Sequence, residues 1–313
     1  MSRVAVIVAT HNRPAELRAC LTSLAGQSRP ADRIVVVDDN PANAESAAVV
    51  AEFADVRYVA GGGLGLAGAH NAGLRATSAD VLAFTDDDVI ADRDWLAQLV
   101  AGFDTPEVGC VTGQIQPLEL ATDAQRMLDA YARFDKGADR RVFDLDEQRP
   151  PGRMFPFAVG AVGSGANMAF TRRALDDIGG FDPALGAGTR AAGGDDLSAF
   201  FEVLVHGYRI VYEPGALVHH RHAAEMSSLR RQVYGYGVGL TAYLTRSLFA
   251  HPRLGGAALR GLPAAVRHVL AAKSDKNRAL PAAYPARLRW AERMGMLVGP
   301  VLYLVSRLER RGA

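Results

Sequence analysis

The amino-acid sequence predicts an α/β protein with a mostly parallel sheet that is flanked by helices, followed by a purely helical extension. Strand-like and helix-like patterns alternate up to about residue 225, and this order is typical of parallel sheets that are covered on both faces. Acidic residues follow two of the apolar runs, at Asp38-Asp39 and at Asp86-Asp87-Asp88. Beyond residue 225 the pattern is helical throughout and rich in Arg, Ala and Leu.

The individual elements are predicted from short apolar runs and from the helix signals between them. Residues 4–9 and 81–85 are mostly apolar runs of the length expected for buried strands. Pro14 stands where a first helical turn tolerates proline. Prolines between residues 136 and 163 predict irregular chain. The predicted strands are 4–9, 33–38, 56–59, 81–85, 164–170 and 209–212, and the predicted helices before residue 225 are 14–25, 44–53, 67–77, about 93–103, and 196–206.

Composition excludes several classes of protein. The net charge of +1 argues against a nucleic-acid partner. The two cysteines, Cys20 and Cys110, form neither a disulfide framework nor a zinc pattern, which favours a reducing compartment. We see no secretory signal, and no stretch reaches the ~18 apolar residues of a membrane span. We therefore expect a cytoplasmic protein, either free or peripheral on the inner face of the membrane.

The triplet Asp86-Asp87-Asp88 is the most informative motif. It ends a predicted strand, and open α/β sheets bind their ligands at the carboxyl ends of strands. Adjacent carboxylates repel one another, a cation would offset this repulsion, and oxygen ligands suit Mg²⁺ or Mn²⁺. The triplet by itself is equally compatible with a solvated helix cap, because Asp is a good N-cap residue.

A second motif, GLGLAG at residues 63–68, matches the G-x-G-x-x-G fingerprint of dinucleotide-binding proteins. That fingerprint normally follows the first strand of the sheet, whereas here it follows the third. The turn after the first strand, residues 9–14, contains no glycine. We therefore do not expect a dinucleotide site.

Six sequence blocks together carry a resemblance to a known family. They are VAVIVATHNRPAELRACLTSLAGQS (4–28), RIVVVDDN (33–40), GLAGAHNAGLRATSADVLAFTDDDV (65–89), GSGANMAFTRRALDDIGGFDPAL (163–185), GGDDLSAFFEVLVHGYRIVYEP (193–214) and ALVHHRH (216–222). Residues 3–222 thereby resemble a family 2 glycosyltransferase of the GT-A fold, and closely resemble actinobacterial-type members with a helical C-terminal extension. The resemblance implies a hexosyltransferase-type enzyme that moves a sugar from a nucleotide diphosphate to an acceptor, with inversion at the anomeric carbon.

The resemblance implies that the loops after the first two strands bind the nucleotide. Thr10, Asn12 and Arg13 stand near a helix N-terminus, which is a favourable place for nucleotide polar groups. Asn and Thr are also ordinary residues of a capped turn. The acid at Asp39 is expected to accept a hydrogen bond from the base, and Asp38 to orient the loop.

Two further blocks match donor-binding segments of the family. His70 and Asn71 fall in the segment between nucleotide and diphosphate, although His70 stands where many relatives have Arg. A partly buried helix histidine explains His70 equally well. Small residues before Asn167 would allow close approach of a sugar ring, and Asn167 offers both a donor and an acceptor.

The acidic triplet corresponds to the family's Asp-X-Asp site. The resemblance implies that Asp86 and Asp88 hold Mg²⁺ or Mn²⁺, with Asp86 also near the ribose, while Asp87 belongs to the donor site with a less defined role. His220 falls where relatives have a histidine near the metal and the diphosphate, so it is a candidate third ligand.

The resemblance also implies the catalytic base. Transfer requires a base because the acceptor hydroxyl must lose its proton as the new bond forms. Asp196 aligns with the family's base, and Asp195 replaces the usual Glu and is expected to contact donor or acceptor hydroxyls. Both acids could instead cap the helix predicted at residues 196–206.

The C-terminal part predicts a different kind of contact. Residues 294–305 are apolar, are flanked by arginines and are interrupted by Pro300. A segment of about 12 residues is too short to span a bilayer, but a basic-flanked apolar helix can lie in the membrane interface. Packing on the domain or against another subunit is the alternative. We expect a GT-A domain at residues 1–222 and a helical extension at 223–313.

The expected partners follow from the same resemblance. The donor is a nucleotide diphosphate sugar, most simply a UDP-sugar, with GDP- and dTDP-sugars as alternatives. The acceptor is a glycan, a lipid-linked sugar or a small molecule, and a homo-oligomer is compatible with the sequence. Two rival functions are a sugar-nucleotide-forming nucleotidyltransferase and a non-catalytic sugar-nucleotide binding protein.

Overall fold

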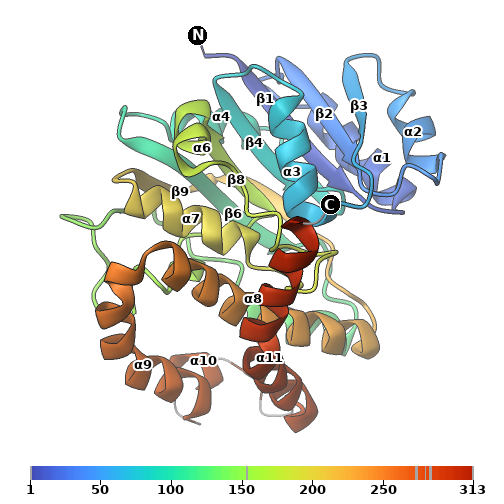
Figure 1. Ribbon diagram of the computed structural model, residues 1–313. Helices are drawn as coiled ribbons and strands as arrows, with labels where there is room; N and C mark the ends of the chain where they lie inside the picture. Colours follow the sequence, from blue (N-terminus) through green and yellow to red (C-terminus); the bar gives the residue numbers. More distant parts are fainter. Residues whose placement is uncertain (1, 153, 272–273, 279, 282–283, 312–313) are drawn as a thin grey trace.

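The first four strands form a parallel half-sheet whose carboxyl ends are level. In this computed structural model, which describes residues 2–152, 154–271, 274–278, 280–281 and 284–311, β1 (Val4–Thr10), β2 (Arg33–Asp38), β3 (Val56–Ala60) and β4 (Val81–Asp86) lie in the order β3-β2-β1-β4 (Figure 1). Thr10 pairs with Asp38, and Ala9 pairs with Asp86. The loops that follow β1, β2 and β4 therefore meet at one edge of the sheet.

The second half of the sheet is mixed. Strand β8 (Asn167–Thr171) runs antiparallel to β4 and to β6 (Val108–Pro117), and β6 runs parallel to β9 (Arg209–His220). Two short strands, β5 (Val89–Ala91) and β7 (Arg141–Phe143), pair antiparallel with β9. The prediction of a mostly parallel sheet is confirmed, because β6 and β9 share the direction of the first four strands.

Helices cover both faces of the sheet. The side chains of α1 (Pro14–Ala25), α2 (Glu45–Val50) and α4 (Trp95–Ala101) pack on one face. The opposite face is covered by α3 (Gly65–Arg75), α6 (Arg172–Ile178) and α7 (Asp195–Val205). Two further elements, α5 (Asp123–Ala132) and the short 3₁₀ helix η1 (Val159–Ala161), lie in the connections. Strands β1 and β4 are buried on both faces, which explains their continuous apolar runs.

The predicted and observed elements differ most in the second half. Helix α1 and strand β2 have their predicted bounds, whereas β8 begins three residues later than expected. The strand predicted at 209–212 continues to His220, because its pairing with β6 passes from Glu213 to Leu217 across a bulge. Pro214 and Gly215 lie in this bulge, so they break the sequence pattern without ending the strand. Strand β6 and helices α5 and α6 were not predicted.

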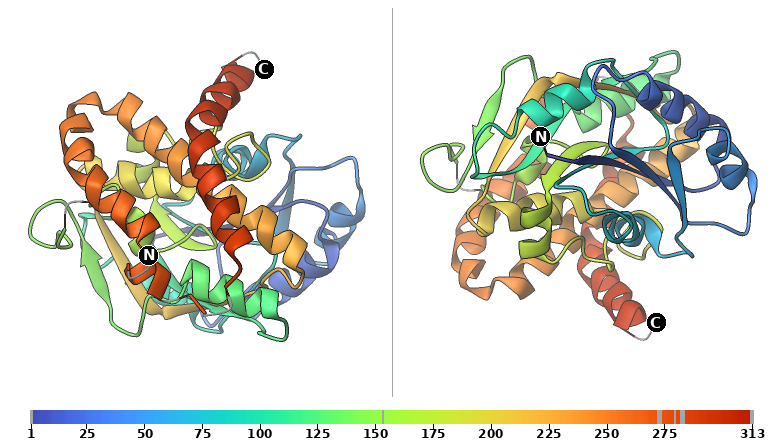
Figure 2. Two further views of the ribbon diagram at one scale, coloured as in Figure 1. Left: turned by 90° about the horizontal axis from the view of Figure 1, so that it is seen from below. Right: turned by 90° about the horizontal axis from the view of Figure 1, so that it is seen from above.

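The C-terminal extension consists of helices that lie below the sheet (Figures 1 and 2). They are α8 (Met226–Ala250), the short 3₁₀ helix η2 (Pro252–Leu254), α9 (Gly255–Leu270), α10 (Asp275–Arg278) and α11 (Ala286–Arg311). Helix α11 continues through Pro300, which interrupts only the apolar character of residues 294–305. Packing against α8 offsets the hydrogen bond that proline cannot make. Among the described residues, none of the helices combines the length and the apolar character that a membrane crossing requires.

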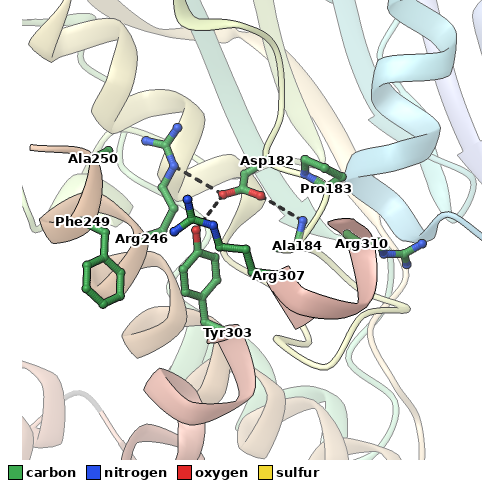
Figure 3. Close-up of a pocket in the computed structure, with 9 residues that line it drawn as sticks. All are labelled: Asp182, Pro183, Ala184, Arg246, Phe249, Ala250, Tyr303, Arg307 and Arg310. Carbon is green, nitrogen blue, oxygen red and sulfur yellow. Dashed lines mark hydrogen bonds and ion pairs between the residues drawn. The ribbon is translucent and has the colours of Figure 1, made fainter. Parts of the chain in front are cut away.

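Asp182 joins the extension to the sheet domain. Its carboxylate accepts a hydrogen bond from the Tyr303 hydroxyl of α11 at 3.0 Å and lies 3.5 Å from the Arg246 Nε of α8 (Figure 3). Beside it lies a cavity of about 340 Å³, lined by Asp182, Pro183, Ala184, Arg246, Phe249, Ala250, Tyr303, Arg307 and Arg310. None of the site residues predicted from the sequence lines this cavity. The contacts around Asp182 hold the ends of α8 and α11 against the domain.

The close packing of α8 and α11 depends on glycine, which yields a stability prediction. A Cβ at Gly295 would overlap the Tyr234 carbonyl oxygen and lie 2.9 Å from the Val238 nitrogen. Gly295→Val should therefore lower the free energy of unfolding by about 1–3 kcal/mol, the usual cost of overpacking. The matched control is Gly256→Val in α9, where a Cβ meets nothing within 4 Å. Urea unfolding curves check this, and equal midpoints for both variants would contradict it.

Candidate active site

The acidic triplet and His220 form a compact cluster at the carboxyl edge of the sheet. Ligand atoms of Asp86, Asp88 and His220 all lie within 4.8 Å of one another. The His220 Nε2 atom is 3.3 Å from an Asp88 carboxylate oxygen and 4.0 Å from an Asp86 oxygen. Pairing of β5 with β9 sets Val89 opposite His220, which brings the histidine to the triplet. The structure thus gathers the three side chains that the sequence predicted as metal ligands.

The electrostatics of this cluster fit a divalent cation. Burial, followed by repulsion from Asp88 and Asp87, raises the pKa of Asp86 well above its usual value. Burial lowers the pKa of His220, so its imidazole is neutral, which is the form that ligates metals. The Asp88 Oδ1 atom is buried and makes no hydrogen bond within the described protein. Two carboxylates and a neutral imidazole are a suitable donor set for Mn²⁺ or Mg²⁺.

Asp87 links the acidic triplet to the residues that follow β1. Its carboxylate accepts hydrogen bonds from the Thr10 hydroxyl at 2.8 Å and from Arg13 at 3.1 Å. Burial is the main reason that the pKa of Asp87 rises to about 6. Arg13 also donates to Asp88 at 2.7 Å. Thr10 and Arg13, which were expected to face the nucleotide, therefore contact the acidic triplet directly.

The loops after β1 and β2 are tied to each other. Asn12 has a left-handed backbone, with φ of 57°, and its side-chain oxygen accepts from Asn40 at 2.9 Å. Asp38 accepts from Tyr58 and from the Asn40 nitrogen, in keeping with its expected role in orienting the loop. Asp39 accepts from the backbone nitrogen of Gly65, at the start of α3, at 3.1 and 3.2 Å. The G-x-G-x-x-G segment thus opens the helix that follows the third strand.

His70 lies in the core instead of facing an open phosphate site. Its side chain is 1% exposed and contacts the rings of Phe84 and Phe181. The His70 Nδ1 atom is 3.6 Å from an Asp195 oxygen. This placement agrees with the alternative of a buried helix histidine, and the expected phosphate role stays a prediction.

Two asparagines predicted to contact the donor have structural partners instead. The Asn71 side chain donates to the Phe181 carbonyl at 2.7 Å and accepts from the Phe181 nitrogen at 2.9 Å. Asn167 is fully buried. Its amide accepts from Trp95 and donates to two backbone carbonyls. Both asparagines therefore stabilise the fold, and their expected donor roles stay predictions.

Asp196 is held by backbone groups in the first turn of α7. One carboxylate oxygen accepts from the Gly165 nitrogen at 2.9 Å, and the other accepts from the Leu197 nitrogen at 2.7 Å. Burial and then repulsion from Asp195 raise the pKa of Asp196 to about 6, although the two backbone donors act in the opposite direction. The helix N-cap is Gly194, so neither acid caps the helix. A half-buried carboxylate with this pKa is suited to accept a proton near neutral pH.

The extension packs directly behind the loop that carries this acid. Gly194 approaches Gly239 of α8 so closely that a Cβ on Gly194 would overlap the Gly239 carbonyl. Gly194 also has a left-handed backbone, with φ of 84°. Both requirements select glycine at this position. Helix α8 therefore fixes the turn from which Asp195 and Asp196 project.

One pair of supporting residues was missed from the sequence. The Nδ1 atom of His222 lies 3.3 Å from Nδ1 of His220, and its Nε2 lies 3.6 Å from an Asp129 oxygen. A partner on the second ring nitrogen orients a ligating histidine. The alternate spacing of His220 and His222 was a signal in the sequence, but Asp129 of α5 was not linked to it.

Comparison with known proteins assigns the family. Residues 5–179 match the model of the family "Glycosyl transferase family 2". The chain is 30% identical over 236 residues to the pre-mycofactocin glycosyltransferase of Mycobacterium tuberculosis, a match that covers 74% of this chain and 46% of that protein. It is 34% identical over 121 residues to the validoxylamine A glucosyltransferase of Streptomyces hygroscopicus subsp. limoneus, covering 35% of this chain and 27% of that protein. The chain thus spans about half the length of the mycobacterial relative.

Solved structures share the fold. The mannosyltransferase PcManGT from Pyrobaculum calidifontis, solved with GDP-Man and Mn²⁺, aligns with a TM-score of 0.60 and 22% identity over 98% of this chain and 87% of that chain. GalNAc-T7, solved with UDP, GalNAc and Mn²⁺, aligns with a TM-score of 0.53 and 15% identity over 78% of this chain and 51% of that chain. These alignments confirm the GT-A fold. By its sheet and by the match over residues 5–179, the chain belongs to glycosyl transferase family 2.

Proposed function

We propose that the protein is a metal-dependent, inverting glycosyltransferase that moves a sugar from a nucleotide diphosphate sugar to an acceptor hydroxyl. The observation that carries this proposal is the cluster of Asp86, Asp88 and His220, whose ligand atoms lie within 4.8 Å of one another. Membership of the family supports the reaction type. The Mn²⁺ in the two aligned structures supports the choice of cofactor.

Each residue of the site has a defined task in this proposal. Asp86, Asp88 and His220 hold Mn²⁺ or Mg²⁺, and the bound cation supplies charge that neutralises the diphosphate leaving group. Thr10 and Arg13 keep the triplet in place through Asp87. Asp196 accepts the proton of the acceptor hydroxyl, and Asp195 beside it contacts sugar hydroxyls.

We propose that the donor is a UDP-sugar, with GDP- and dTDP-sugars as the alternatives. PcManGT was solved with GDP-Man and GalNAc-T7 with UDP, so the fold accommodates both bases. In this chain Asp39 is the proposed partner of the base, together with the loop that contains Asn12. Single contacts to sugar hydroxyls select the donor sugar. For the acceptor we propose only the class of molecule, which is a glycan, a lipid-linked sugar or a small molecule.

The rival functions have less support. A nucleotidyltransferase would need a glycine-rich loop after the first strand, and residues 9–14 contain no glycine. A non-catalytic binding protein has no need of Asp196, which is held by two backbone donors and has a pKa of about 6.

We further propose that residues 1–222 and residues 223–313 form two parts with different roles. The first part carries the donor and the catalytic acids, and the second part supports the Asp196 loop and locates the enzyme. Of the acceptor classes, a lipid-linked sugar on the cytoplasmic side of a membrane best suits the surface of the extension, where Leu297, Val301 and Leu308 of α11 are exposed. A homo-oligomer formed through this surface is the alternative.

A thermal-shift screen tests the proposed function. With Mn²⁺ present, the correct nucleotide diphosphate sugar should raise the melting temperature by a few degrees, because a ligand that binds the folded state stabilises it by mass action. The same donor should be hydrolysed slowly without an acceptor. EDTA is expected to abolish both effects. A donor that shifts the melting temperature equally with EDTA, and is never hydrolysed, would favour the non-catalytic rival.

A further inference from the structure

Helix α9 presents its apolar residues to solvent and its small residues to the protein. Leu259, Leu262, Val266 and Leu270 are between 46% and 71% exposed. Their spacing of three and four residues puts them on one side of the helix. The only buried residue of α9 is Gly261. A helix of a monomeric domain normally has the reverse arrangement, so the outer face of α9 is built to be covered.

Helix α11 shows the same arrangement in part. Its buried side includes Glu292, Gly295, Gly299 and Ser306, which are polar or small, together with the larger Leu288 and Tyr303. The exposed side consists of larger apolar residues at intervals of three and four. They are Trp290, Met294, Leu297, Val301, Leu304 and Leu308.

Both helices lie on the same side of the sheet domain. Seen from below, α9 and α11 lie in front of the sheet, and they extend beyond the domain that carries the acidic triplet (Figure 2). We call the exposed apolar residues that recur at intervals of three and four on α9 and α11 the platform. The platform comprises Leu259, Leu262, Val266, Leu270, Trp290, Met294, Leu297, Val301, Leu304 and Leu308.

Charge is distributed very unevenly between the two parts of the chain. Residues 223–313 contain fifteen arginines and lysines against four acidic residues, a formal net charge of +11, whereas residues 1–222 carry −10. In α11 the acids are Glu292 and Glu309, of which Glu292 accepts from Tyr131 and Glu309 pairs with Arg190. Helix α9 has no acidic residue and carries Arg260 and Arg267. The platform is thus an apolar surface that is surrounded by basic residues.

We propose that the platform lies in the interface of an anionic membrane, with its apolar side chains among the acyl chains and its arginines at the lipid phosphates. Apolar helices with basic flanks bind such surfaces by burial and by attraction to acidic lipids. A second copy of the chain is a less suitable partner for the platform, because the basic residues around one platform would then face the basic residues around the other. Trp290, which is 60% exposed, suits the level of the headgroups. This inference is independent of the proposed glycosyl transfer.

Vesicle binding of the full chain tests the inference. The intact protein should sediment with vesicles rich in phosphatidylglycerol and much less with phosphatidylcholine alone, and high salt should weaken its binding. The pairs Leu259→Ser with Leu262→Ser, and Leu297→Ser with Val301→Ser, keep the net charge and should each weaken binding about tenfold or more. The control is Leu120→Ser, because Leu120 is 39% exposed outside the platform and should bind as wild type does.

Fluorescence locates the contact. Brominated lipids should quench Trp290, and Trp290→Phe should remove that quenching because the other tryptophan, Trp95, is fully buried. The proposal is overturned if the intact chain ignores anionic vesicles or binds both lipid types equally. It is also overturned if Leu297→Ser with Val301→Ser converts a dimer to a monomer without changing vesicle binding. Donor hydrolysis without vesicles should be unchanged in all variants, which separates this test from that of the proposed function.

Discussion

Asp196→Asn is expected to lower turnover by roughly 10²–10⁴-fold while leaving donor affinity nearly unchanged. The substitution keeps the shape of the side chain but removes its capacity to accept a proton. Asn can still accept one of the two hydrogen bonds that the carboxylate now receives from Gly165 and Leu197. Steady-state transfer rates, with donor binding measured separately, check the prediction.

The neighbouring acid is the matched control, and the pH profile gives a second readout. The pKa of Asp196 is about 6, so the transfer rate should fall about tenfold per pH unit below that value as the base becomes protonated. Asp195→Asn removes a negative charge that raises this pKa, so its acidic limb should move to lower pH. A greater loss of turnover in Asp195→Asn than in Asp196→Asn would mean that the base is the other acid.

Asp88→Ala is expected to weaken metal-dependent binding of the nucleotide diphosphate by roughly 10²-fold or more, because the cation loses a charged ligand. The fold should survive, since Arg13 retains its contact with Asp87 at 3.1 Å. Calorimetric titrations of UDP and GDP with Mn²⁺, and again with EDTA, measure the effect.

A second acid serves as the control for this variant. Asp55 is exposed and precedes β3, at the amino end of a strand, whereas the triplet begins at the last residue of β4. Asp55→Ala should therefore bind nucleotide as the wild type does. Equal affinities for Asp88→Ala and wild type, with and without metal, would remove Asp88 from the metal site.

Much of the first half-sheet could be predicted because its signals are local. Residues 33–38 and 14–25 have their predicted bounds, since a buried parallel strand is a continuous apolar run and Pro14 marks a first helical turn. The second half was harder, because β9 contains a bulge at Pro214 and Gly215 that a local pattern cannot distinguish from a strand end. The extension was predicted to be helical throughout, and α11 indeed continues through Pro300.

The candidate site shows the same division between local and distant information. The position of the acidic triplet at the end of an apolar run was visible in the sequence, and the resemblance to the family then singled out Asp86, Asp88, Asp196 and His220. The protein contacts of Asn71 and Asn167 could not be predicted, since their partners, Phe181 and Trp95, are far away in the chain.

The sequence by itself determined the class of fold, the acidic triplet and the helical extension, because strand periodicity, charge and composition are properties of neighbouring residues. Only the tertiary structure decided that His220 reaches the triplet through β9, that His70 is enclosed between Phe84 and Phe181, and which apolar residues of α9 and α11 remain outside. Burial and ligand distance depend on which segments pack together. That packing is set by the summed contacts of the whole chain and not by any local pattern.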